Sequence, residues 1–212
     1  MVTRARGRPP QGFVVSDEVL LDAVLQAFGE NGYDGSSMRE IARRFNISHN
    51  LMPQRFGSKM KLWHAAIDHG FSRLQEDLEH EALSLGDDEV EILRGLIGYF
   101  IEANALHPSL LQIINQEASL PGPRLDYLFD RYIKPARDFG DAWLTRLAEQ
   151  GRIAPVSVSL MYFLMTHGAG GMFALPELSR RLTTGARGYS PGTIKEQVEN
   201  AVSVIFDGVI PR

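Results

Sequence analysis

The sequence predicts an all-α protein with an N-terminal three-helix, helix-turn-helix head on a larger C-terminal helical bundle. Apolar residues recur at helical spacing along most of the chain, and no stretch after residue 58 alternates in the manner of a strand. Residues 36–59 read as two short helices joined by a tight turn, followed by the start of a third helix. With 212 residues, 44% of them hydrophobic, the chain can bury a substantial core.

The head is expected to begin with an amphipathic helix over residues 20–31, which Gly32 ends. In the next helix Ser37 can serve as the N-cap, and Glu40 three residues later completes a capping box. The apolar positions of this helix recur at helical spacing and give it one apolar face; they are Met38, Ile41, Ala42 and Phe45.

A tight turn and a second short helix follow. Asn46 tolerates the left-handed backbone conformation that such a turn requires, and Ile47 is expected to pack beneath it. Ser48 can cap a helix that begins at His49. This spacing is typical of a helix-turn-helix, whose second helix enters the major groove of DNA. An ordinary helical hairpin shows the same spacing, so both interpretations stay open at this point.

These motifs resemble the TetR/AcrR family of transcriptional repressors over the N-terminal third of the chain. The residues that carry the resemblance are Leu20–Asn31, Gly32, Tyr33, Ser37–Ala42, Ile47, Ser48, Phe56–Lys59 and Leu62. The resemblance implies a DNA-binding head, a divergent sensing body and a dimer. The chain departs from the family at Pro53, where the recognition helix usually has an aromatic residue. Either this helix kinks at Pro53 or its regular part begins later.

The charge of the chain supports a DNA-binding head. Residues 1–63 hold nine Lys and Arg against six acidic residues, which leaves +3 there and −7 on the rest of a chain of net charge −4. Residues 1–15 are expected to form a disordered basic arm that suits an AT-rich minor groove, although a merely solubilising tail fits equally well.

The candidate DNA-binding residues fall into three groups. The arm contributes arginines, the start of the second short helix contributes groups that can read base edges, and the remaining residues can bind phosphates. In that order they are Arg4, Arg6 and Arg8; His49, Asn50 and Gln54; and Ser37, Arg39, Arg55 and Lys59.

The sequence divides into the arm, a head over residues 16–63 and a helical body over residues 64–212. In the body, helices are expected over residues 59–85, 90–106, 109–119, 124–150, 155–175 and 193–209, with a short segment near 176–182. Pro135 is expected to kink the helix over residues 124–150.

Two of these helices are apolar enough to predict a homodimer. Val156–Leu175 is apolar on most of its circumference, and its glycines would let another helix approach closely. The last helix has an apolar stripe that includes Val198, Val202 and Ile205. Both helices could instead be core helices of one subunit. A dimer is favoured because one helix-turn-helix reads too few base pairs, and it predicts a palindromic operator on double-stranded DNA.

Polar side chains on otherwise apolar helices, with aromatic residues in the same segments, suggest a pocket for a small hydrophobic effector. For each residue taken singly, a filled core or a satisfied hydrogen bond is the competing interpretation. The candidates are Phe100, Asn104, His107, Gln116, Phe139, Trp143 and His167.

The composition argues against other classes of function. The chain has no cysteine, so disulfides, thiolate metal sites and cysteine nucleophiles are excluded. Its six histidines are scattered, no metal site or cofactor is expected, and no catalytic motif is found. No apolar run reaches the length of a membrane span, and a cytoplasmic protein is expected. The prediction is therefore a DNA-binding repressor, not an enzyme, that an effector releases from its operator; the alternative is a helical binding or catalytic protein without DNA function.

Overall fold

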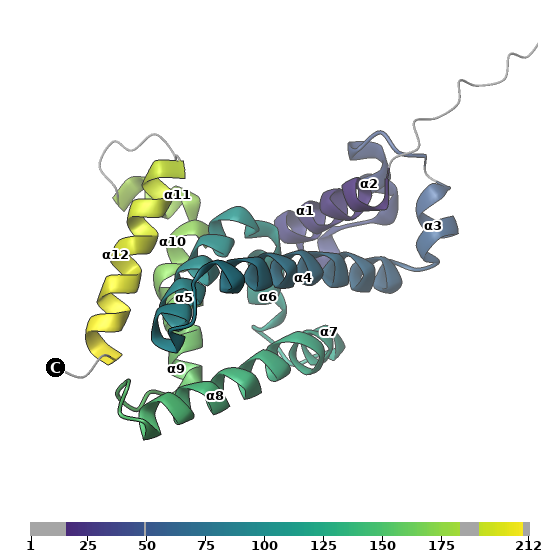
Figure 1. The fold of residues 1–212 in the computed structure, drawn as a ribbon. Coiled ribbons are helices and arrows are strands. Elements are labelled where there is room, and N and C mark those ends of the chain that lie inside the picture. The colour runs from purple at the N-terminus through teal and green to yellow at the C-terminus, as the bar shows by residue number, and fades with distance from the viewer. Residues whose placement is uncertain (1–15, 49, 183–190, 210–212) are drawn as a thin grey trace, which may run out of the picture.

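The computed structural model describes residues 16–48, 50–182 and 191–209, and within these ranges every regular element is a helix (Figure 1). The all-α prediction is confirmed. The head comprises α1 (Asp17–Gly35), α2 (Met38–Arg44) and α3 (Leu51–Phe56). A long helix, α4 (Lys59–Ser84), runs from the head into the body (Figure 1).

The remaining helical segments form the body. They are α5 (Glu89–Leu106), α6 (Pro108–Glu117), α7 (Pro123–Leu128), η1 (Phe129–Ile133), α8 (Lys134–Glu149), α9 (Val158–Phe163), η2 (Leu164–Ala169), α10 (Gly171–Ala174), α11 (Pro176–Leu182) and α12 (Pro191–Val209). Figure 1 shows α3 and α12 at opposite ends of the molecule, with α8 along one side. The expected positions of the body helices are therefore confirmed, although two of the expected helices are divided.

A π-helical turn interrupts the helix that was expected over residues 124–150. Pro135 has no N–H and its ring would collide with the carbonyl group four residues earlier in a regular α-helix. The chain instead widens over η1, where the N–H of Lys134 bonds to the carbonyl oxygen of Phe129, and α8 then carries Pro135 in its first turn. In place of the expected kink at Pro135, the helix has a π turn just before it, and this turn holds one more residue than an α-helical turn.

Buried apolar side chains gather in two cores. The head core is formed by side chains from the first four helices. Three residues of the body complete it: Leu110 and Ile113 of α6, and Leu128 of α7. The body core joins α5, α8, α9, α10 and α12, with Leu147 and Ile153 among its most deeply buried members. The expected boundary at residue 63 thus falls inside α4, and the head is completed by residues from the body.

The last helix uses its apolar stripe inside its own subunit. Val198, Val202 and Phe206 are buried in the body core, and Ile205 packs against it. The buried part of this stripe is therefore used within the subunit, and the dimer stays a prediction. The side of α12 that stays exposed carries Val204.

Candidate nucleic-acid interface

Ser37 caps the start of α2 as predicted, and Glu40 bonds to the Ser37 hydroxyl instead of to its backbone N–H. Ser37 accepts a hydrogen bond from the backbone N–H of Glu40 at 3.1 Å, and its hydroxyl donates to the Glu40 carboxylate at 2.8 Å. This cap orients the first turn of α2, where Arg39 is exposed. Arg44 at the other end of α2 forms an ion pair with Glu30 of α1, and this hydrogen-bonded pairing lowers the pKa of the Glu30 carboxyl.

The turn between α2 and α3 also has the predicted geometry. Asn46 has a φ of 55°, the left-handed conformation that asparagine tolerates. The N–H of Ile47 bonds to the carbonyl oxygen of Ala42 at 2.7 Å, and the Ile47 side chain is buried in the head core. The turn therefore fixes the start of α3 relative to α2.

α3 begins two residues later than predicted. Its N-cap is Asn50 and not Ser48, and no side-chain hydrogen bond caps it. Pro53 consequently occupies the third helical position, where a missing N–H leaves no intrahelical bond unmade. The first bond of the helix runs from the N–H of Gln54 to the carbonyl oxygen of Asn50 at 3.2 Å. Of the two alternatives for Pro53, the later helix start is correct and no kink is needed.

The two faces of α3 differ sharply. Met52 is fully buried in the head core, with Leu51 and Phe56 packed against it, whereas Asn50 and Gln54 are exposed. Arg55 is also exposed as a residue, and its guanidinium group pairs with Asp17 at the start of α1. Four candidates lie outside the described residues: His49 and the arm arginines Arg4, Arg6 and Arg8.

Lys59, a candidate for phosphate binding, lies against an aromatic ring. Ser58 caps α4 by accepting from the N–H of Lys61 at 3.2 Å, and the Lys59 ammonium group lies 4.3 Å from the centre of the Tyr33 ring. The Arg124 guanidinium group of α7 lies 4.2 Å from the centre of the same ring. Tyr33 therefore connects the start of α4 with the body.

Sequence reasoning missed the role of Arg124. Arg124 directly follows the helix-breaking segment Pro121–Pro123, and nothing in the neighbouring sequence indicates that it lies near Tyr33. Only the fold brings the two residues together. In the structure Arg124 also forms an ion pair with Glu117 of α6 at 2.8 Å, and this hydrogen bond raises the pKa of the guanidinium group.

The candidate effector residues do not gather in one place. Asn104 is buried, and its amide nitrogen donates to the carbonyl oxygen of Phe100 at 2.7 Å. Gln116 instead donates to the carbonyl oxygen of Gly29 in α1 at 2.7 Å, so it lies where the body meets the head. Trp143 packs against the body core.

The three remaining effector candidates lie towards the surface. Phe139 is 69% exposed, and its ring centre is 6.0 Å from that of Trp143. His167 is exposed and hydrogen-bonds Thr166 through Nδ1 at 2.7 Å. His107 is half-buried at the junction of α5 and α6, with Nε2 3.5 Å from the Asp77 carboxylate.

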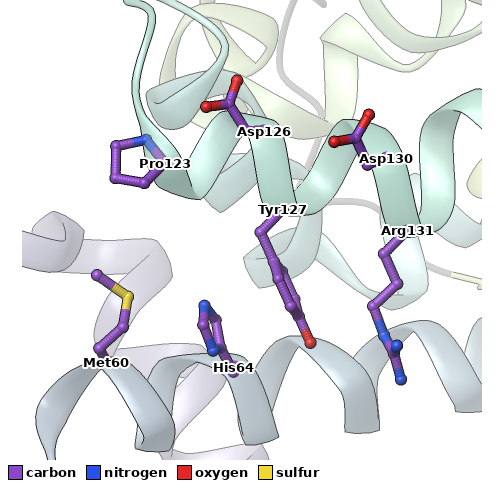
Figure 2. A pocket seen from close by; sticks show the side chains of 7 residues that line it. All are labelled: Met60, His64, Pro123, Asp126, Tyr127, Asp130 and Arg131. Atoms are coloured by element: carbon purple, nitrogen blue, oxygen red, sulfur yellow. The ribbon is translucent and has the colours of Figure 1, made fainter.

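An open hollow of about 540 Å³ lies between the head end of α4 and α7–η1. Figure 2 shows His64 and Met60 on α4 across from Tyr127 and Arg131, with the carboxylates of Asp126 and Asp130 on the far side of α7–η1; Pro123 completes the lining. None of the candidate effector residues lines this hollow. Within the described part of the chain no three His, Asp or Glu side chains are grouped to hold a metal ion.

The head geometry agrees with what sequence comparison finds. Residues 20–66, from α1 into α4, match the family described as bacterial regulatory proteins, tetR family. The head of this chain is therefore that of the TetR family. Among the helices of the described residues, none is long and apolar enough to cross a membrane.

A curated relative shows how far the sequence similarity extends. The HTH-type transcriptional repressor Rv3405c of Mycobacterium tuberculosis is 34% identical over 77 residues, which cover 36% of this chain and 41% of the relative. The match thus spans about two fifths of the length of that relative.

Solved structures share the whole fold at lower identity. AibR in complex with isovaleryl coenzyme A and operator DNA has a TM-score of 0.67 at 20% identity, with 89% of this chain and 97% of that chain covered. The ketosteroid transcriptional regulator KstR2 of Mycobacterium tuberculosis has a TM-score of 0.63 at 22% identity, with 95% and 98% covered. These similarities show that the body has the same fold as those regulators, where the sequence alone predicted only helices.

Proposed function

We propose that this protein is a sequence-specific DNA-binding repressor that acts as a homodimer on a palindromic operator and is released by a small hydrophobic effector. One observation carries the DNA-binding part. α3 is held on its inner side by Met52 and at its end by the ion pair of Arg55 with Asp17, while Asn50 and Gln54 stand exposed on the other side. An amide side chain in this position can bond to the edge of adenine in the major groove.

The phosphate contacts are proposed for residues that flank α3. Arg39 is exposed beside the capped start of α2, and Lys59 follows the capped start of α4. Both would act through charge and position and would carry no base preference. The arm arginines would add minor-groove contacts.

A dimer would cover apolar side chains that the subunit leaves in solvent. Leu160 and Phe163 of α9 are 53% and 58% exposed, and Val204 of α12 is 75% exposed. α12 also packs beside η2, which continues α9. A second copy related by a two-fold axis would bury these surfaces against each other and would place two heads on successive major grooves.

The effector part rests on the body and on its fold. A buried Asn104 and a partly buried Trp143 lie in the body, and AibR, of the same fold, binds both a coenzyme A thioester and operator DNA. A ligand that binds more tightly to the arrangement of the subunits that cannot bind DNA lowers the affinity for the operator. The loss equals the difference in the ligand's binding free energy between the two arrangements.

Apolar metabolites and acyl thioesters can be screened by thermal shift. Trp143→Ala should abolish ligand-induced release while leaving DNA affinity near that of the wild type.

The test of the proposed function is binding to duplex DNA from the promoter of the protein's own gene. The purified protein should retard this fragment in preference to random DNA of equal length, and its affinity should fall steeply with salt concentration. Equal binding to both fragments, or none, would instead favour a helical ligand-binding protein without DNA function.

A further inference from the structure

One face of α4 is turned towards α7–η1. His64, Asp68 and Phe71 occupy positions i, i+4 and i+7 and therefore lie along a single stripe of the helix. The His64 ring stacks on Tyr127 with ring centres 4.0 Å apart, and the Phe71 ring stacks on Tyr132 at the same separation. Two aromatic pairs thus flank the carboxylate of Asp68.

Both tyrosines donate to the same oxygen of Asp68. The Tyr127 hydroxyl lies 2.5 Å from Oδ1, the Tyr132 hydroxyl bonds to it as well, and Arg131 Nε lies 3.3 Å away. Burial together with the Asp68 carboxylate raises the pKa of Tyr132 to about 12 and raises the pKa of Tyr127 too. Both phenols are protonated at neutral pH and can donate.

The π turn is what lets two residues five apart reach one carboxylate. In a regular α-helix Tyr127 and Tyr132 would point about 140° apart around the axis. The wider turn of η1 takes up one extra residue and brings the two side chains towards the same side. Since Pro135 disfavours a regular helix here, the sequence itself maintains this convergence.

Side chains bridge α4 and α7–η1 beside open space. The hollow of about 540 Å³ lies along the same junction, with His64 and Tyr127 in its wall (Figure 2). Leu128 of α7 packs in the head core at this junction, and the polar groups of Asp68, Tyr127 and Tyr132 add hydrogen bonds to that apolar contact.

We propose that Asp68 is a positioning residue that fixes the head relative to the body by holding Tyr127 and Tyr132. α4 starts at Lys59 beside α3, and η1 continues into α8, which packs in the body core. A movement of α8 is therefore transmitted through this clamp of Asp68, Tyr127 and Tyr132 to the helix that carries the head. The expected change in operator affinity rests on the proposed function, whereas the expected change in the position of the head relative to the body does not.

The first experiment measures head position without DNA. The chain has no cysteine, so Glu18→Cys on α1 and Glu149→Cys on α8, both exposed, can take spin labels specifically. Dilution with unlabelled protein isolates the distance within one subunit. Asp68→Asn should broaden or shift this distance distribution, because a neutral amide accepts more weakly from the two hydroxyls and no longer pairs with Arg131. Asp130→Asn removes an exposed carboxylate in the wall of the same hollow and should leave the distribution unchanged.

The second experiment measures affinity for the promoter fragment. Asp68→Asn should weaken binding by at least about fivefold, as expected when the DNA-competent arrangement is less populated. Tyr132→Phe keeps the ring stack and loses only the hydroxyl, so it should weaken binding less. The double variant should be no weaker than Asp68→Asn alone, because both changes break one clamp.

The results separate the two proposals. If the wild type fails to bind its promoter fragment, the repressor function is wrong and the distance measurement alone decides the role of Asp68. An unchanged distance distribution in both Asp68→Asn and Tyr132→Phe overturns that role. If the distances change while operator affinity stays within twofold or tightens, the clamp does not hold the DNA-competent arrangement. Should Asp68→Asn fail to fold, Tyr127→Phe and Tyr132→Phe replace it in both measurements.

Discussion

Gly29 of α1 and Ser109 of α6 approach so closely that a Cβ atom on Gly29 would lie 3.0 Å from both the Cα and the carbonyl oxygen of Ser109. Both of these atoms belong to the backbone and cannot rotate away. This backbone contact holds the head against the body, and the side-chain oxygen of Gln112 also lies 3.0 Å from that Cβ position. Gln116 reinforces it by donating to the carbonyl oxygen of Gly29 at 2.7 Å.

Gly29→Ala should therefore destabilise the protein, although alanine is the better helix former. We expect a loss of about 1–3 kcal/mol in the free energy of unfolding, typical of overpacking at a rigid contact. Gly98→Ala in α5 is the matched control, because its new methyl group would meet two side chains at ordinary contact distances, Val202 at 3.5 Å and Val198 at 3.8 Å. That control should be neutral or stabilising by up to about 1 kcal/mol. Urea denaturation of both variants measures the difference, and equal stability would contradict the close contact.

Gln54→Ala tests base reading by α3. The exposed amide is proposed to bond to a base edge, so its loss should cost roughly 1–3 kcal/mol of operator affinity and relax the preference at one base pair. Arg39→Ala should instead weaken all sequences alike and reduce the salt slope by about one unit. Binding to operator variants at several salt concentrations separates the two effects. Unchanged selectivity in Gln54→Ala would remove this residue from the readout.

Phe163→Glu tests the proposed dimer. Phe163 is 58% exposed on α9, and a carboxylate there would be buried without a partner in the dimer. The variant should be a folded monomer by light scattering at micromolar concentration and should lose binding to a palindromic site. Leu83→Glu is the control, since Leu83 is 86% exposed at the far end of α4. A wild-type protein that is itself a monomer would exclude the dimer altogether.

Asp88 gives a pH-dependent contribution to stability. It caps α5 by accepting from the N–H of Val90 at 2.8 Å and from that of Glu91, and it pairs with Arg152. These hydrogen bonds, the backbone ones first, lower its pKa below the ordinary 3.8. A carboxyl whose pKa is lowered in the folded state stabilises the fold at pH values above its unfolded pKa and loses this contribution as the pH falls through the folded pKa.

Asp88→Ala should accordingly lower the melting temperature at pH 7. The difference from the wild type should shrink as the pH falls below 3.8. Asp88→Asn can still cap the helix and should retain part of the stability at pH 7. Thermal unfolding of the three proteins between pH 3 and pH 7 provides the measurement, and a difference that is constant with pH would count against the carboxylate as the cause.

The sequence predicts local structure in this chain better than it predicts contacts. Capping and turn geometry depend on neighbouring residues, so the Ser37 N-cap and the left-handed Asn46 could be inferred correctly. The start of α3 could not, because Ser48 and Asn50 are both good caps and only the packing of Met52 selects between them. The apolar stripe of α12 was visible in the sequence, but periodicity cannot tell whether its partner is α5 of the same subunit or another copy.

Contacts between distant segments were the least predictable. Nothing near Gln116 in sequence shows that its partner is Gly29, so an amide expected in an effector pocket proved to link the body to the head. The meeting of Tyr127 and Tyr132 at Asp68 was equally hidden, since it depends on the π turn over Phe129–Ile133 and on the packing of that turn against α4.

The composition of the head core has a consequence for how such proteins can be recombined. A chimera cut at residue 63 would join a new sensor to a head that lacks its own Leu110, Ile113 and Leu128, and would leave Trp63 and Phe28 partly uncovered. A transplant that also carries α6 and α7 from the donor keeps this interior intact. The unit that can be exchanged between relatives is therefore discontinuous along the chain. Gene fusions at residue 63 should yield insoluble protein far more often than grafts that carry the head, α6 and α7 together.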